Sequence, residues 1–265
     1  PGGEVLLDRF PALPAAEQLQ AHLQAANWLE QHELIEEAAR HVLKAGHRDR
    51  AYELAERSLY DAIMKRGRQA AVLEWLGNLP AEEVDRRPTL LLAAAWSLAL
   101  SERHEEAGRM VDRLLSQPDA SKALSCECGL ILSGAAIFAD RPDRFAALHD
   151  PWAEAPPLTD ANLLQVHANR RAYRALLEGE PALGRLRQQG APRQGFHHDT
   201  EYVDHWGQFI VGLSYLWEGQ ALLAESLLQP VLASAEAHLG RRGRFTCMLA
   251  ALLAAALWER NRPGD

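Results

Sequence analysis

The feature of this sequence that most constrains its fold is the regular spacing of the breaks in its helical pattern. Apolar residues recur at helical intervals along almost the whole chain, and short polar or Gly/Pro stretches interrupt them. Breaks that suit tight helix-to-helix turns are about 35 to 44 residues apart, a spacing typical of repeated helix pairs, and they lie near His32, Gly67, His104, Arg141, Gly179, Gly219 and Pro263. Because one such pair cannot bury its apolar face alone, a stacked array of antiparallel helix pairs is predicted.

The composition favours the same all-α class. Ala and Leu make up roughly a third of the 265 residues, while Val, Ile and Thr together supply well under a tenth. Ala and Leu lose little on entering a helix, whereas β-branched side chains suit a sheet. Two stretches interrupt the array, a Pro-rich segment at residues 150–157 and a Gly-rich loop at residues 189–195, which precedes the candidate helix N-cap Asp199. Neither is long enough to separate independent domains, so residues 1–265 are predicted to form a single domain.

Charge and cysteine content exclude several functions. The net charge is −8, and the three lysines and scattered arginines form no concentrated basic stripe for nucleic acid. The run Arg241-Arg242-Gly243-Arg244 is interpreted as a solvated loop that leads into a helix. Cys126, Cys128 and Cys247 do not have the spacing of a zinc site or disulfide framework, and they are predicted to be buried thiols of a reducing cytoplasm. No stretch has the apolar length of a membrane span.

The sequence carries few catalytic signatures. It contains no P-loop, no Gly-x-Ser-x-Gly elbow, no His-Glu-x-x-His and no Cys-x-x-Cys, and the chain is predicted not to be an enzyme. One cluster lies at residues 197–205, where His198, Glu201 and His205 would share a helix face and could hold a divalent metal. The alternative is that Asp199 and Glu201 complement a helix N-terminus while the histidines bind nothing. That alternative is preferred, and no metal is predicted.

The repeats share one side-chain pattern as well as their spacing. Gly212, Tyr215, Gly219 and Ala224 place small, aromatic, turn and small residues at intervals of three, four and five. Small residues at the first and last places let two helices approach closely. The same offsets recur around Glu102 (Ala95, Leu98, Ala107), Arg141 (Gly134, Ile137, Ala146) and Gly179 (Ala172, Ala175, Gly184). These segments resemble divergent tetratricopeptide repeats, which implies a right-handed superhelix of antiparallel helix pairs.

In a superhelix of this kind the first helix of each pair lines a concave surface, where ligands usually lie. Aromatic and amide side chains at these positions suit the pocket of a sugar, aromatic or apolar effector. The alternative is that they only pack one repeat against the next. The predicted ligand-binding residues are Trp96, Phe138, Asn169, Tyr173, Trp206 and Phe209.

Two stretches carry a more specific resemblance. The first covers residues 25–46 (AANWLEQHELIEEAARHVLKAG), and the second covers residues 66–80 (RGRQAAVLEWLGNLP) and continues through Arg87-Pro88 to Trp96. Both resemble the start of the helical sensor region of MalT-type regulators, the large ATP-binding LuxR-family transcriptional activators. The Trp75-Leu76-x-x-Leu79-Pro80 element followed by an Arg-Pro helix start is the most specific part. The match is strong over about residues 20–110 and only repeat-level beyond.

The resemblance implies the function of a sensor fragment from a longer cytoplasmic protein. Such a region would bind a small-molecule inducer or a regulatory protein and relay that binding to ATP-dependent self-association and transcription activation. No cofactor is expected in the fragment itself, because ATP would bind elsewhere in the full-length regulator. No direct nucleic-acid contact and no membrane contact are expected of it.

Two alternatives stay open. A stand-alone tetratricopeptide adaptor would bind a peptide from a partner protein. A helical enzyme would act through the cluster at residues 197–205 and would contain stoichiometric metal. The inducer and the oligomeric state do not follow from the sequence.

Overall fold

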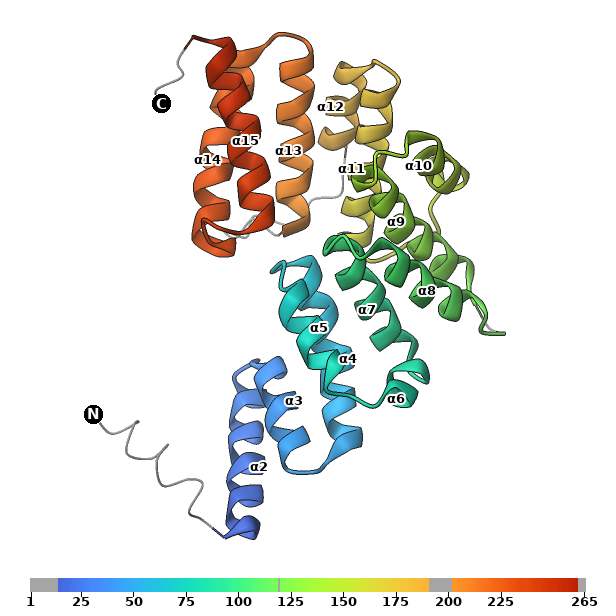
Figure 1. Cartoon of the computed structure of the whole chain (residues 1–265), viewed down its shortest axis with the longest axis vertical. Coiled ribbons are helices and arrows are strands. Elements are labelled where there is room, and N and C mark those ends of the chain that lie inside the picture. Colours follow the sequence, from blue (N-terminus) through green and yellow to red (C-terminus); the bar gives the residue numbers. More distant parts are fainter. Residues whose placement is uncertain (1–13, 119, 191–201, 262–265) are drawn as a thin grey trace, which may run out of the picture. The chain divides into compact units, whose positions relative to one another are not determined.

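The computed structural model describes residues 14–118, 120–190 and 202–261, and within these ranges the chain is all-helical, as predicted (Figure 1). None of the described residues forms a strand. The helices are α2 (Ala15–Gln31), α3 (Ile35–Lys44), α4 (Arg48–Met64), α5 (Gln69–Gly77), α6 (Ala81–Asp85), α7 (Pro88–Leu100), α8 (His104–Leu115), α9 (Lys122–Phe138), α10 (Pro142–His149), the short 3-10 helix η2 (Asp150–Trp152), α11 (Ala161–Leu177), α12 (Pro181–Gln189), α13 (Tyr202–Trp217), α14 (Ala221–Leu239) and α15 (Arg244–Glu259).

Internal contacts divide the chain into two compact units, Pro1–Asp61 and Ala62–Asp265. The boundary falls inside α4, three residues before its end. Each unit is therefore described by itself, and a single domain over residues 1–265 stays a prediction.

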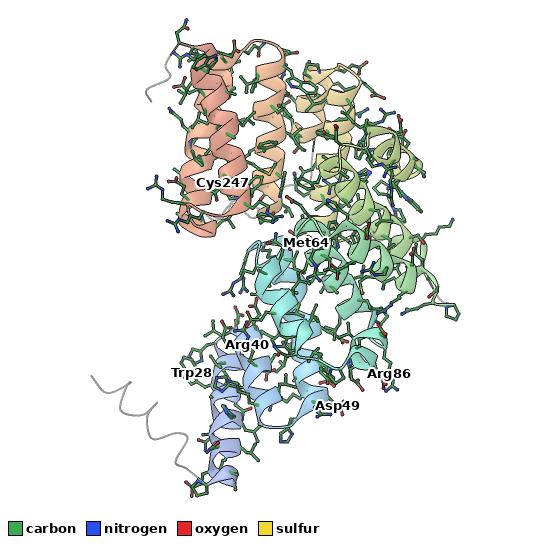
Figure 2. All side chains as sticks on the ribbon, viewed as in Figure 1. Trp28, Arg40, Asp49, Met64, Arg86 and Cys247 are labelled. Atoms are coloured by element: carbon green, nitrogen blue, oxygen red, sulfur yellow. The ribbon has the colours of Figure 1, made fainter. Side chains whose placement is uncertain are left out.

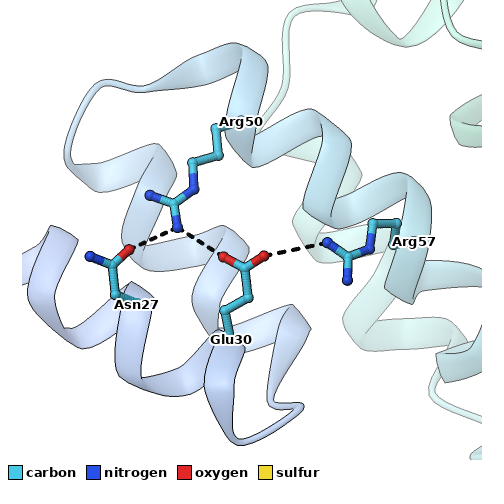
Figure 3. Close-up of polar contacts among 4 residues, drawn as sticks. All are labelled: Asn27, Glu30, Arg50 and Arg57. Carbon is cyan, nitrogen blue, oxygen red and sulfur yellow. Dashed lines mark hydrogen bonds and ion pairs between the residues drawn. The ribbon is translucent and has the colours of Figure 1, made fainter.

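The first unit contains α2, α3 and most of α4. Glu30 on α2 accepts hydrogen bonds from Arg50 (2.8 Å) and Arg57 (3.4 Å) on α4, and Arg50 also donates to Asn27 (2.8 Å; Figure 3). The hydrogen bond from Arg50 is the main cause that lowers the pKa of Glu30, against a smaller opposing effect of burial. Because these side chains are partly exposed, such pairs contribute at most about 1 kcal/mol each.

In the second unit, consecutive helices pack together as pairs: α7 with α8, α9 with α10, α11 with α12, and α13 with α14. The first helices of these pairs also contact one another, in the order α7, α9, α11, α13, and α5, which follows the turn at Gly67, contacts α7. The final helix α15 packs on α14 and α13. This order of contacts is what stacked helix pairs require.

The turns between paired helices repeat one backbone geometry. A residue with positive φ lies within two residues of each predicted break, at Glu33, Gly67, Glu102, Asp140, Gly179, Gly219 and Asn261. After α7, the amide of Glu102 donates to the carbonyl of Ala99 and that of Arg103 to the carbonyl of Leu98. These paired bonds form a Schellman motif, which satisfies the last carbonyls of a helix. Equivalent pairs of bonds end α2, α9, α11 and α13.

The small residues of the repeat pattern do let helices approach closely. A Cβ placed on Gly184 of α12 would lie 3.1 Å from the carbonyl oxygen of Ala172 on α11. These two residues are the last and first places of the pattern around Gly179. The predicted role of small residues is therefore confirmed at this helix pair.

Several local predictions can be compared with the structure directly. Residues 150–157 form no α-helix, and Gly243 precedes the first residue of α15, as expected of a loop that leads into a helix. Cys126 and Cys128 are buried, and burial raises their pKa values to about 11 and about 12. The prediction is wrong for Cys247, which is exposed (Figure 2) because α15 packs on its neighbours along its other face. No helix in the described ranges is long and apolar enough to span a bilayer.

The turn geometry leads to a prediction for Gly219, which has a φ of 73° and open space around its Cβ position. Gly219→Ala is expected to lower the free energy of unfolding by about 1 kcal/mol, because alanine is strained in the left-handed region. Gly77 also has open space but ends α5 with ordinary φ, so Gly77→Ala is expected to raise it by roughly 0.5–1 kcal/mol. Urea denaturation followed by circular dichroism measures both changes, and equal effects of the two substitutions would contradict the assignment.

Candidate functional site

The second unit holds a pocket of about 350 Å³, a size that suits a small molecule. Its walls come from parts of the unit that are far apart in the sequence. The early part supplies residues 66–70 around the start of α5 and residues 100–102 at the end of α7, and α9 supplies Phe138. The late part supplies Tyr202 and Trp206 of α13, residues 238–239 at the end of α14, and residues 243–245 and Met248 at the start of α15.

Aromatic rings form the apolar wall of the pocket. The ring of Trp206 lies 4.3 Å from that of Phe245 and 5.5 Å from that of Phe138, measured between centroids. The ring of Tyr202 stands edge-on to those of Phe245 (5.7 Å) and Trp206 (6.4 Å). Leu100, Leu239 and Met248 complete this wall. An apolar surface built of aromatic rings binds the body of an aromatic or apolar ligand.

Further direct contacts join the early and late walls. The amide of Tyr202 donates a 2.9 Å hydrogen bond to the carbonyl of Lys65, and the Tyr202 ring lies so close to Gly67 that a Cβ there would be 2.8 Å from its Cδ2. Across the pocket, Arg244 forms a 3.0 Å ion pair with Glu102. Segments more than a hundred residues apart therefore meet at this pocket.

The hydroxyl of Tyr202 is a neutral group of the wall. Burial raises its pKa. The phenol therefore stays protonated at neutral pH. The pocket combines an apolar wall with a polar rim, which is an arrangement suited to binding.

Two of the six predicted ligand-binding residues, Phe138 and Trp206, line this pocket. Trp96 instead lies in the interface between α7 and α9, where it is 2% exposed and its indole nitrogen donates to Glu127 (2.9 Å). Asn169 is 2% exposed, and its side chain bonds to Gln165, Gln188 and the carbonyl of Val203. Both are buried with their hydrogen-bonding groups occupied by other parts of the chain.

The remaining two predicted residues are half-buried between helices. Tyr173 stands edge-on to Phe145 of α10, with ring centroids 5.6 Å apart. Phe209 packs on Phe245 at 6.1 Å, behind the pocket wall. Their binding of a ligand stays a prediction, but the pocket does not include them.

Several residues that line the pocket are not among the residues predicted from the sequence to bind a ligand. Tyr202 and Phe245 lie at the starts of α13 and α15. The superhelical register predicts ligand-binding residues only in the middle of each first helix, so it does not include them. Arg244 was treated only as part of a solvated loop. The combination of an Arg-rich loop with a following Phe, Arg244-Phe245, was the available signal.

The possible metal cluster falls largely outside the described residues, which exclude His197, His198 and Glu201. Of that cluster, His205 is described and buried, with its Nε2 atom 3.2 Å from the hydroxyl of Ser234. Within the described ranges, no group of three His, Cys, Asp or Glu residues could hold a metal ion.

Comparison with known proteins gives a partial match. No family model matches the chain, and no solved structure matches it significantly. The chain is similar to the serine/threonine-protein kinase PknK of Mycobacterium tuberculosis and of Mycobacterium bovis, with 29% identity over 143 residues in each case. The aligned stretch is 51% of this chain but only 12% of the length of each relative.

One triplet of this chain coincides with a protein-kinase motif. His47-Arg48-Asp49 matches the first three residues of the catalytic-loop pattern H-R-D-L-x-x-x-N, but the place of its asparagine is taken by Leu54. Asp49 lies in the first turn of α4, where a carboxylate complements the helix N-terminus, and Leu54 is buried (Figure 2). The triplet is therefore explained as a helix start.

Proposed function

We propose that this chain is the effector-sensing region of a MalT-type, LuxR-family transcriptional regulator and has no catalytic activity of its own. Its helix pairs form a right-handed, tetratricopeptide-like superhelix within a longer cytoplasmic protein. An inducer or a regulatory protein binds to it, and binding controls ATP-dependent self-association of the whole regulator. The observation that carries the proposal is the pocket whose walls come from both ends of the second unit.

A pocket of this construction can convert binding into a change of conformation. A ligand that contacts both walls stabilises the arrangement in which residues 66–102 and 202–248 are together. It can shift such an equilibrium only by its difference in affinity for the closed and open arrangements. A ligand with no affinity for the open arrangement stabilises the closed one by about 2.7 kcal/mol at a ligand concentration of 100 times Kd.

The residues that resemble MalT-type regulators have structural positions that support this proposal. Trp75 is 5% exposed in α5 and packs in the helix interface, and Leu79 is buried after it. Pro88 is the first residue of α7, as the Arg-Pro pattern predicts. The similarity to PknK concerns too small a part of those proteins for kinase activity to be proposed here.

Trp206→Ala is expected to abolish the thermal stabilisation of the chain by a bound effector while leaving its helical circular dichroism intact. The reason is that the indole forms the centre of the aromatic wall. Effectors are found by a thermal-shift screen against sugars, aromatic compounds and small metabolites. Trp217→Ala is the matched control, because Trp217 lies on the same helix α13 but is 54% exposed and away from the pocket.

Two results would contradict the proposal. One is a Trp206→Ala variant that keeps the full ligand-induced shift, which would place the effector elsewhere. The other is a natural gene that encodes neither a P-loop upstream nor a helix-turn-helix downstream of this segment, which would exclude a MalT-type regulator.

A second candidate function, an adaptor that binds a partner protein, is favoured by exposed apolar side chains at one end of the last three helices. Trp217 ends α13, Leu222 and Leu223 begin α14, and Trp258 is near the end of α15. Affinity capture with the chain would recover a protein partner in this case, and Leu222→Glu would prevent the capture while Trp206→Ala would not.

A further inference from the structure

We infer that the pocket takes a ligand with a flat apolar body and an anionic group, such as an aromatic carboxylate, sulfonate or phosphate. This inference rests on the proposed effector site and adds the chemical class of the effector. The anionic group would lie at the rim, beside Arg68 and Arg244, and the apolar body would lie against Trp206 and Phe245.

The rim of the pocket is rich in arginine, although the whole chain carries a net charge of −8. The described lining residues include three arginines, Arg66, Arg68 and Arg244, against one carboxylate, that of Glu102. Each guanidinium has five N–H donors, so the ion pair with Glu102 leaves Arg244 with donors for a second anion. Arginine is also the residue best suited to bind carboxylate and phosphate groups through two parallel bonds.

Two helix N-termini add to this positive potential. The start of α5, at Arg68 and Gln69, and the start of α15, at Gly243 and Arg244, both line the pocket. Neither helix has a side-chain cap or an acidic residue in its first turn, whereas α3 and α8 each carry two acidic residues there. Uncompensated backbone amides at a helix start favour a bound anion.

The opposite wall is apolar and aromatic. The Trp206 ring contacts those of Phe138, Tyr202 and Phe245, and Leu100 and Met248 also line the pocket. A strongly hydrated ligand such as a free inorganic anion would leave this surface exposed to water. A ligand that has only an apolar body would leave the charged rim unused. A ligand that has both an anionic group and an apolar body is therefore favoured over a free inorganic anion and over an uncharged apolar molecule.

The test uses two fluorescent probes that share an aromatic body and differ in charge. 8-Anilinonaphthalene-1-sulfonate carries a sulfonate, and N-phenyl-1-naphthylamine is its uncharged counterpart. Binding of each probe to the 265-residue chain is measured by fluorescence titration. The parent chain is expected to bind the sulfonate about three- to ten-fold more tightly than the neutral probe, the size of one to two favourable charge contacts at a partly exposed rim. This preference should decrease as salt is added.

Rim variants give changes of opposite sign. Arg68→Gln and Arg244→Gln should each weaken binding of the sulfonate about three- to ten-fold and change the neutral probe less than two-fold. Glu102→Gln should strengthen binding of the sulfonate, because it removes the carboxylate that competes for Arg244. Arg241→Gln is the matched control, since Arg241 lies on the same loop but does not line the pocket.

The outcomes separate the ligand class from the site. If Trp206→Ala weakens both probes while the arginine variants affect neither, the pocket binds ligands but the anionic class is wrong. If Trp206→Ala changes neither probe, the pocket is not a ligand site, and the proposed function loses its support as well. Equal losses in Arg241→Gln and Arg244→Gln would also overturn the inference, because they would indicate a general charge effect.

Discussion

Trp96→Ala is expected to lower the free energy of unfolding by about 4–5 kcal/mol, the upper part of the range for removing a large buried side chain. Trp96 is 2% exposed in the middle of α7, so its removal leaves a cavity at the contact with α9. It also removes the indole donor from Glu127, a carboxylate that is itself buried. A buried charged group that loses a hydrogen-bond donor adds to the cost of the cavity.

Urea denaturation of three variants separates these contributions. Trp96→Phe keeps much of the volume but loses the hydrogen bond, and it should cost about 1–3 kcal/mol. Trp258→Ala removes the same side chain from a site that is 69% exposed, and it should change stability by less than about 0.5 kcal/mol. A Trp96→Ala variant as stable as the parent would instead support the prediction that Trp96 lies on an accessible ligand-binding surface.

The all-helical fold and its turns could be predicted because both depend on local patterns. Glycine marks the left-handed residue at Gly67, Gly179 and Gly219, and the helical period stops there. At Glu102 and Asp140 the same geometry is adopted by residues that rarely take it. Paired Schellman bonds close the turns at Glu102, Asp140, Gly179 and Gly219, and side-chain types alone do not reveal them. The repeat is therefore more regular in hydrogen bonds than in sequence.

The candidate site could be predicted only in part, for a physical reason. The rings of Phe138 at the end of α9 and Trp206 near the start of α13 do lie together, although α11 comes between these two helices in the order of contacts. The helical register does not predict that Gly67 lies next to Tyr202 or that Glu102 lies next to Arg244. Those contacts depend on the number of helix pairs between the residues and on the rotation of each pair relative to the preceding pair. Residues at the start of α5 therefore carry no sequence signal of their own, and those at the start of α15 carry only the Arg244-Phe245 pair.

The register also could not distinguish a ligand amide from an amide that holds helices together. Asn169 of α11 accepts hydrogen bonds from Gln165 (3.0 Å) and from Gln188 of α12 (2.8 Å), and it donates to the carbonyl of Val203 on α13 (3.0 Å). Gly207 faces this network, and a Cβ there would lie 2.7 Å from the Oε1 atom of Gln188. One buried side chain thus links three helices.

Asn169→Leu is expected to lower the free energy of unfolding by about 3–5 kcal/mol. Leucine has the same branched shape but is larger, so part of the cost is overpacking, and the rest comes from buried donors and acceptors that lose a partner, at about 1–3 kcal/mol each. Asn78→Leu is the control, because Asn78 is exposed and its side chain bonds only to the carbonyl of Glu74, and it should cost less than about 0.5 kcal/mol. Equal stability of the two variants in urea denaturation would contradict the structural role.

Asn169→Asp provides a test with a pH signature. The new carboxyl would be buried against the Val203 carbonyl, so its pKa in the folded chain would lie above its unfolded value. Between these two values the folded state binds more protons than the unfolded state, and stability relative to the parent therefore falls as pH rises. At pH 4 the protonated carboxyl can still donate to Val203, and the variant should be closest to the parent there. A stability difference from the parent that does not change between pH 4 and pH 7 would mean that position 169 is open to water, as a ligand-binding residue on the concave surface would be.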